Sequence, residues 1–166
     1  MMKMKVLIIM GSDSDLPIMD ETAKVLCEFG IPFRMTVASA HRTPERTLKT
    51  VREAEKNGAE VIVSGAGMAA HLPGVIASHT ILPVIGVPLD VPPLHGMDAL
   101  LSIVQMPPGI PVATVAIGKA GARNAGILAC QIIARKDASL SKKLAEHRKK
   151  MAREVEEKAA RIEKKK

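Results

Sequence analysis

The chain has 166 residues and a mass of 17.7 kDa, which suits one domain with a full core better than two. Aromatic residues make up only 1% of the chain, and this argues against proteins that stack bases or sugars on exposed rings. The net charge of +7 lies in residues 135–166, which hold 13 Lys and Arg against 6 Asp and Glu, so we expect a solvated basic helix there and no nucleic-acid partner.

The cysteines and the apolar runs bear on the cellular compartment. Cys27 and Cys130 each fall within an apolar helical pattern and provide neither a disulfide framework nor a zinc-site spacing. The apolar run Val6–Met10 is too short for a signal-peptide core, and no stretch approaches the length of a membrane span. We therefore expect a cytoplasmic protein with no membrane partner. The five histidines are scattered, so no metal site is predicted.

Short β-rich runs alternate with helical patterns along the chain. In chain order, strands are predicted at Val6–Met10, Phe33–Val37, Val61–Ser64, Val84–Val87 and Val112–Ile117. A first helix is predicted to follow Asp15 and to end at Gly30, and others are predicted over Met97–Gln105 and Ala120–Ala134. A further helix is predicted to begin at Pro44, with Thr43 as its N-cap and with Leu48 and Val51 facing inward. This alternation predicts a single α/β domain over residues 1–134, a three-layer flavodoxin-like parallel sheet with helices on both faces.

Residues 135–166 are predicted to form a helical extension that begins at Ser139. Its apolar positions make one narrow stripe: Leu140, Leu144, Met151, Val155 and Ile162. A helix this long with so thin a stripe has little to cover on a monomer, so we expect it to pack on a neighbouring subunit.

Ligands of parallel α/β sheets bind outside the carboxyl ends of the strands, and four loops lie there. They are Gly11–Asp15, Ser39–Thr43, Gly65–Gly74 and Asp90–Gly96. In the first, Ser12 and Ser14 offer hydroxyl groups beside a helix N-terminus, which favours an anion. One of Asp13 and Asp15 is expected to cap the helix, while the other could accept hydrogen bonds from sugar hydroxyls.

The second loop carries the residues best suited to chemistry. Thr43 and Pro44 have the structural task of opening a helix, whereas Ser39, His41 and Arg42 do not. Arginine binds anions through two parallel hydrogen bonds, and histidine transfers protons near neutral pH. A site for an anionic ligand with His41 as proton shuttle is the interpretation that these residues favour.

The third loop permits a rival interpretation. Gly65–Ala70 matches G-x-G-x-x-A after a strand, and Asp90 follows at about the distance of a ribose-binding acid in dinucleotide sites. Against this interpretation, Pro73 and Gly74 interrupt the helix that would carry the pyrophosphate, so the glycines are expected to let backbone wrap a smaller ligand.

Four blocks in a fixed order resemble one known family. They are Met-Gly-Ser-Asp-Ser-Asp at 10–15, Ser-Ala-His-Arg-Thr-Pro at 39–44, Gly-Ala-Gly and Ala-Ala-His-Leu-Pro-Gly within 65–74, and Ser-Ile-Val-Gln-Met-Pro at 102–107. The chain is similar to the class I N5-carboxyaminoimidazole ribonucleotide mutases, the family of the phosphoribosylaminoimidazole carboxylase catalytic subunit. This resemblance covers residues 5–134.

The resemblance implies a reaction and an assembly. A carboxylate would move from the exocyclic nitrogen to C4 of an aminoimidazole ribonucleotide, as carbon dioxide is released and recaptured in a closed pocket, without ATP, metal or cofactor. It implies a homo-octamer with active sites between subunits, acting downstream of an ATP-dependent synthetase. His41 would be the catalytic acid and base. The substrate-binding residues would be Ser12, Ser14, Asp15, Ser39, Arg42, Gly65, Gly67, Ala70, His71 and Leu72.

The chain departs from the family pattern at a few positions. Met68 stands where the family usually has Gly, Arg123 stands where Ala is common, and the Asp90–His95 stretch differs from the usual small polar residues. A related class carboxylates aminoimidazole ribonucleotide directly and typically has Lys where this chain has Arg42. The resemblance therefore favours the mutase, with direct carboxylation as the alternative.

Overall fold

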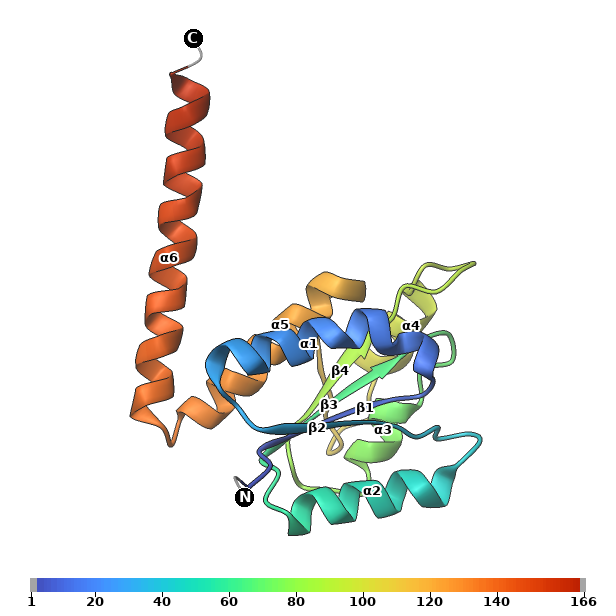
Figure 1. Ribbon diagram of the computed structural model, residues 1–166. Coiled ribbons are helices and arrows are strands. Elements are labelled where there is room, and N and C mark those ends of the chain that lie inside the picture. Colours follow the sequence, from blue (N-terminus) through green and yellow to red (C-terminus); the bar gives the residue numbers. More distant parts are fainter. Residues whose placement is uncertain (1–2, 165–166) are drawn as a thin grey trace.

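Five parallel strands form the central sheet of the computed structural model, which describes residues 3–164 (Figure 1). The strands are β1 (Val6–Met10), β2 (Phe33–Val37), β3 (Val61–Ala66), β4 (Val84–Pro88) and β5 (Ala113–Thr114). They are ordered β2-β1-β3-β4-β5, with every neighbouring pair parallel.

Helices cover both faces of this sheet. They are α1 (Leu16–Phe29), α2 (Pro44–Lys56), α3 (Leu72–Ala77), α4 (Met97–Val104), α5 (Gly118–Ala134) and α6 (Ala138–Glu163), with a 3-10 turn, η1 (Asp13–Asp15), before α1. One apolar core contains side chains of α1 and α5, and the other contains side chains of α2, α3 and α4. The three-layer flavodoxin-like α/β fold is confirmed.

The aliphatic runs of the central strands explain the two cores. Successive side chains of a strand point to opposite faces, and β1 sends Val6 and Ile8 into the α1/α5 core but Leu7 and Ile9 into the other. Every residue of β1, β3 and β4 is buried. A continuous apolar sequence is therefore the pattern that this sheet requires.

Several details differ from the sequence-based expectations, among them the ends of β3, β4 and α5, which lie one or two residues beyond the predicted bounds. The last strand is limited to Ala113–Thr114, because only this part of the edge strand pairs regularly with β4. The expectation that Pro73 and Gly74 interrupt a helix is wrong: both lie within α3, and Pro73 is in its first turn, where a missing N–H is tolerated. On α2, Leu48 is only half-buried, and the threonines at 47 and 50 share the inner face with Val51.

Helix α6 extends away from the sheet over most of its length (Figure 1). Asp137 caps its first turn by accepting a 3.0 Å hydrogen bond from the backbone N–H of Leu140, the one buried residue of the helix. Farther along, Met151, Val155 and Ile162 are 54%, 65% and 69% exposed. None of the helices within residues 3–164 has both the length and the apolar character of a membrane span.

Candidate active site

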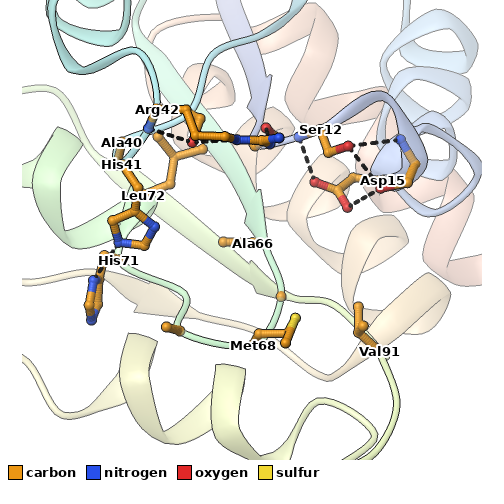
Figure 2. Close-up of a pocket in the computed structure, with 15 residues that line it drawn as sticks. Ser12, Asp15, Ala40, His41, Arg42, Ala66, Met68, His71, Leu72 and Val91 are labelled. Carbon is orange, nitrogen blue, oxygen red and sulfur yellow. Dashed lines mark hydrogen bonds between the residues drawn. The ribbon is translucent and has the colours of Figure 1, made fainter.

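A cavity of about 340 Å³ opens at the carboxyl edge of the sheet, over β1, β2 and β3 (Figure 2). The chain leaves β1 to form β2 on one side and later forms β3 on the other side of β1. The loops after these strands therefore diverge around a crevice, the position at which parallel α/β sheets bind ligands. The lining residues are Gly11, Ser12, Ser14, Asp15, Ser39, Ala40, His41, Arg42, Ala66, Gly67, Met68, Ala69, His71, Leu72 and Val91.

The first loop is held by its own side chains. The Ser12 hydroxyl accepts from the backbone N–H of Ser14 at 3.3 Å, while Asp15 Oδ2 accepts from the backbone N–H of Ser12 at 3.0 Å. These reciprocal bonds form a capping box around η1. Asp13 also accepts from the Ser14 N–H, at 3.0 Å. Both carboxylates thus stabilise the turn, and only Asp15 also lines this cavity.

Burial raises the pKa of Asp15 above its usual value of 3.8. The hydrogen bonds from Ser12 and Ser14 and the charge of Arg42 act in the opposite direction, but the loss of hydration outweighs them. A carboxyl group in this environment gains from additional donors, which the hydroxyl groups of a sugar can supply.

Arg42 connects the second loop to the first. One of its terminal nitrogens donates to the backbone carbonyl of Gly11 at 2.9 Å, and its backbone N–H donates to Ser39 Oγ at 3.2 Å. The Thr43 side chain does not cap α2 as expected. It accepts from the Ser39 N–H at 2.9 Å and so braces the loop. The guanidinium group is thereby held among hydroxyl groups, a suitable place for an anion.

His41 and His71 meet at the other end of the cavity. His41 Nε2 lies 2.7 Å from His71 Nδ1, and the rings are nearly perpendicular, with centroids 4.9 Å apart (Figure 2). One ring must donate and the other must accept in this bond. The sequence indicated both histidines separately but gave no sign of their contact. The pair can hold and transfer a proton.

Met68 and Val91 form an apolar wall of the cavity. Met68 has a φ of 54°, in the left-handed region that favours glycine, and its side chain is 54% exposed. A Cβ atom at Gly67 would lie 2.8 Å from Val91 Cγ2, so glycine allows the third and fourth loops to approach closely. Asp90 does not line the cavity and pairs instead with His95 at 3.1 Å.

Eight of the ten predicted substrate-binding residues, together with His41, line the cavity. The other two, Gly65 and Ala70, lie behind its wall. A Cβ atom at Gly65 would collide with the buried Met19 side chain, and Ala70 is part of the core. The cavity is also lined by residues that the sequence analysis did not select, among them Ala40, Ala66 and Ala69. These small residues lie in or next to the loops that it did select, and that position was the signal that could have identified them.

Three helices that begin at this edge share one feature. Pro17, Pro44 and Pro73 lie at the first or second position of α1, α2 and α3, and none of these helices has a side-chain cap hydrogen bond. Proline suits the first turn because its fixed φ is helical and its missing N–H would have no partner there. Across residues 3–164, no three His, Cys, Asp or Glu side chains gather as a metal site.

Comparisons with known proteins point to one family. The model of the AIR carboxylase family matches residues 5–154. N5-carboxyaminoimidazole ribonucleotide mutase of Pyrococcus horikoshii is 59% identical over 94% of this chain and 87% of its own, and that of Thermotoga maritima is 56% identical over 94% and 90%. The crystal structure of Treponema denticola PurE superposes with a TM-score of 0.86 at 27% identity, covering 94% of this chain and 96% of its own.

Proposed function

The chain belongs to the AIR carboxylase family and acts as a mutase in purine biosynthesis, and we propose that His41 is the group that transfers the proton in its reaction. The substrate is N5-carboxyaminoimidazole ribonucleotide, and the product is 4-carboxy-5-aminoimidazole ribonucleotide. The observation that carries the assignment is the His41–His71 contact at one end of a cavity whose other end holds Arg42 and serine hydroxyls. The dinucleotide interpretation of Gly65–Ala70 is set aside, because the curated relatives are mutases.

The proposed reaction returns the proton that it uses. The imidazolium of His41 protonates the exocyclic nitrogen as the nitrogen–carboxylate bond breaks and carbon dioxide leaves. The electron-rich C4 carbon then attacks the carbon dioxide and forms the new carbon–carbon bond. His41 removes the C4 proton and so regains its starting state, because an imidazole ring can both donate and accept a proton.

His71 is proposed as a positioning residue for His41. The 2.7 Å contact orients the His41 ring, which is otherwise on an exposed loop. A fixed ring orientation places the proton along the direction of transfer. Leu72, Gly67 and Met68 also line the cavity and are proposed to exclude water from the imidazole and carbon dioxide.

The polar end of the cavity suits the ribose phosphate. Ser12, Ser39 and Arg42 converge there and are proposed to bind the phosphate, with Ser14 as a further hydroxyl donor. Asp15 is proposed to accept hydrogen bonds from the ribose. Its partly buried carboxyl group already faces this cavity.

The test follows isomerisation of N5-carboxyaminoimidazole ribonucleotide by absorbance, without ATP or metal, beside a reaction of aminoimidazole ribonucleotide with bicarbonate. Fast conversion of the first substrate, and of the second only at very high bicarbonate, is the expected result. Efficient use of the second would establish direct carboxylation instead. His41→Asn should bind ligand and lose turnover. The matched control is His79→Asn, because His79 is exposed and lies outside the cavity, and this variant should keep wild-type turnover. Normal turnover by His41→Asn would remove the assignment.

The assembly is proposed to be a homo-octamer with active sites between subunits. Helix α6 supports this, because its exposed Met151, Val155 and Ile162 make an apolar stripe on a helix that leaves the body of the domain (Figure 1). We expect light scattering to give the mass of eight chains for the wild type and a smaller mass for Met151→Glu/Val155→Glu. A monomeric wild type would overturn the assembly.

The cellular setting is inferred from the same chemistry. The N-carboxylated substrate must be supplied by an ATP-dependent carboxylating synthetase. Two free cysteines accord with a reducing cytoplasm, where we place the enzyme.

A further inference from the structure

A second cavity, of about 410 Å³, adjoins the candidate active site and shares part of its lining. It shares Gly11, Ser12, Ser39 and Arg42 with the first cavity. It contains neither histidine, and its remaining lining residues are Asp13, Val37, Ala38, Thr43 and Arg46. The residues proposed to bind the substrate phosphate therefore border both cavities, and Arg46 borders only the second.

Arg46 is held in place by the end of strand β2. Its Nε donates to the backbone carbonyl of Val37 at 3.1 Å, and Nη2 donates to Thr36 Oγ1 at 3.4 Å. The remaining terminal nitrogen, Nη1, makes no hydrogen bond within residues 3–164. Two anchored nitrogens leave the third as a donor at a fixed position, unlike a freely rotating surface arginine.

Arg46 lies in the N-terminal turn of its helix, where Glu45 is the one acidic residue. It is the third residue of α2, and the N-terminal turn of a helix carries a partial positive charge that disfavours a cation. A bound phosphate would offset both positive charges.

The charges that face the second cavity lead to the same inference. Asp13 lines it with one negative charge, so Arg42 alone would leave the lining neutral. A phosphate carries about two negative charges and is bound better by a lining with a net positive charge, which the guanidinium group of Arg46 supplies.

We propose that Arg46 is a further recognition residue for the substrate's 5′-phosphate, acting from the second cavity beside Arg42. Its role is to bind and to discriminate a phosphorylated ligand from an unphosphorylated one. It takes no part in the proton transfer. The proposal rests on the proposed function only in that the substrate carries a phosphate.

The first measurement is calorimetric binding of ribose 5-phosphate to the full chain. Arg46→Gln is the informative variant, because its amide can still donate to Val37 while the charge is lost. It and Arg46→Ala should weaken binding about tenfold, with binding of ribose unchanged. Arg34→Ala is the matched control: Arg34 is an exposed arginine of β2 that pairs with Glu53 at 3.4 Å and lines neither cavity, so it should bind like the wild type.

Kinetics provide the second measurement. Arg46→Gln should raise KM for the ribonucleotide about tenfold while kcat changes little, and the rise in KM with added salt should be smaller than in the wild type. Wild-type KM and ribose 5-phosphate affinity in Arg46→Gln would overturn the proposal. A loss of kcat at unchanged KM would also overturn the proposal, because that result is expected if Arg46 only stabilises the loop and does not bind the phosphate. An inactive wild type that still shows Arg46-dependent binding would refute the proposed function and leave this inference standing.

Discussion

At position 68, a glycine variant should be more stable than an alanine variant, which reverses the order found at most positions in helices and strands. Its φ of 54° lies in the left-handed region, which costs a residue with a Cβ atom roughly 1–2 kcal/mol. Alanine at this position keeps that cost, whereas glycine removes it and gives up about 0.4–1 kcal/mol through the greater freedom of the unfolded chain. Both variants lose the same packing of a half-exposed side chain. Met68→Gly should therefore be more stable than Met68→Ala by about 1 kcal/mol.

The comparison can be made by thermal and urea unfolding. For a chain of 166 residues, that difference corresponds to a Tm higher by about 2–4 °C for the glycine variant. Arg52, an exposed residue within α2, provides the control pair, where alanine should be the more stable by about 1 kcal/mol. The reasoning fails if alanine equals or exceeds glycine at position 68 while the Arg52 pair behaves normally.

Three further outcomes follow from burial and packing. Burial raises the pKa of the Cys130 thiol to about 11, whereas Cys27 is exposed. One thiol of the folded chain should therefore react quickly with a disulfide reagent, and both should react in denaturant; two fast thiols in the folded chain would contradict this. Because the pKa of Asp15 is raised above 3.8, its contribution to stability is fully present below 3.8 and is lost as the pH rises through the folded-state pKa. The urea midpoint of Asp15→Asn should not show this fall with rising pH. A pH profile of the midpoint that is the same in the variant and the wild type would refute the contribution of Asp15. Gly126→Ala should lower the free energy of unfolding by about 1 kcal/mol, since overpacking outweighs the gain in helix propensity. The new methyl group would lie 2.8 Å from Val25 Cβ, and denaturant unfolding would detect the change.

The fold could be read from the sequence wherever burial is one-sided or complete. Val6–Met10 is apolar throughout because both of its faces are covered, and its bounds were predicted without error. The pattern Val112–Ile117 looked equally regular, but pairing at the sheet edge ends after two residues, and residue types alone do not determine where an edge strand stops pairing. Helix α3 was missed because six residues are too few to show a helical period.

The site was predictable as a set of loops but not as a set of contacts. Strand ends indicated the loops around the site, and His41 could be selected from the second of them, whereas His71 was selected from the family resemblance. Their 2.7 Å contact depends on two side-chain rotamers that no sequence pattern encodes. The same holds for Arg42, whose bond to the Gly11 carbonyl crosses between two loops, and for Arg46, which resembled an ordinary surface residue of α2.

The prolines that open α1, α2 and α3 have a thermodynamic consequence for ligand binding. Pro17, Pro44 and Pro73 restrict the backbone at the start of each helix whether or not a ligand is bound. Segments that are already ordered lose little conformational entropy on association, so more of the interaction energy appears as affinity. Binding that does not require folding of a segment also buries little additional apolar surface. The heat-capacity change on binding should accordingly be small, as for a rigid receptor.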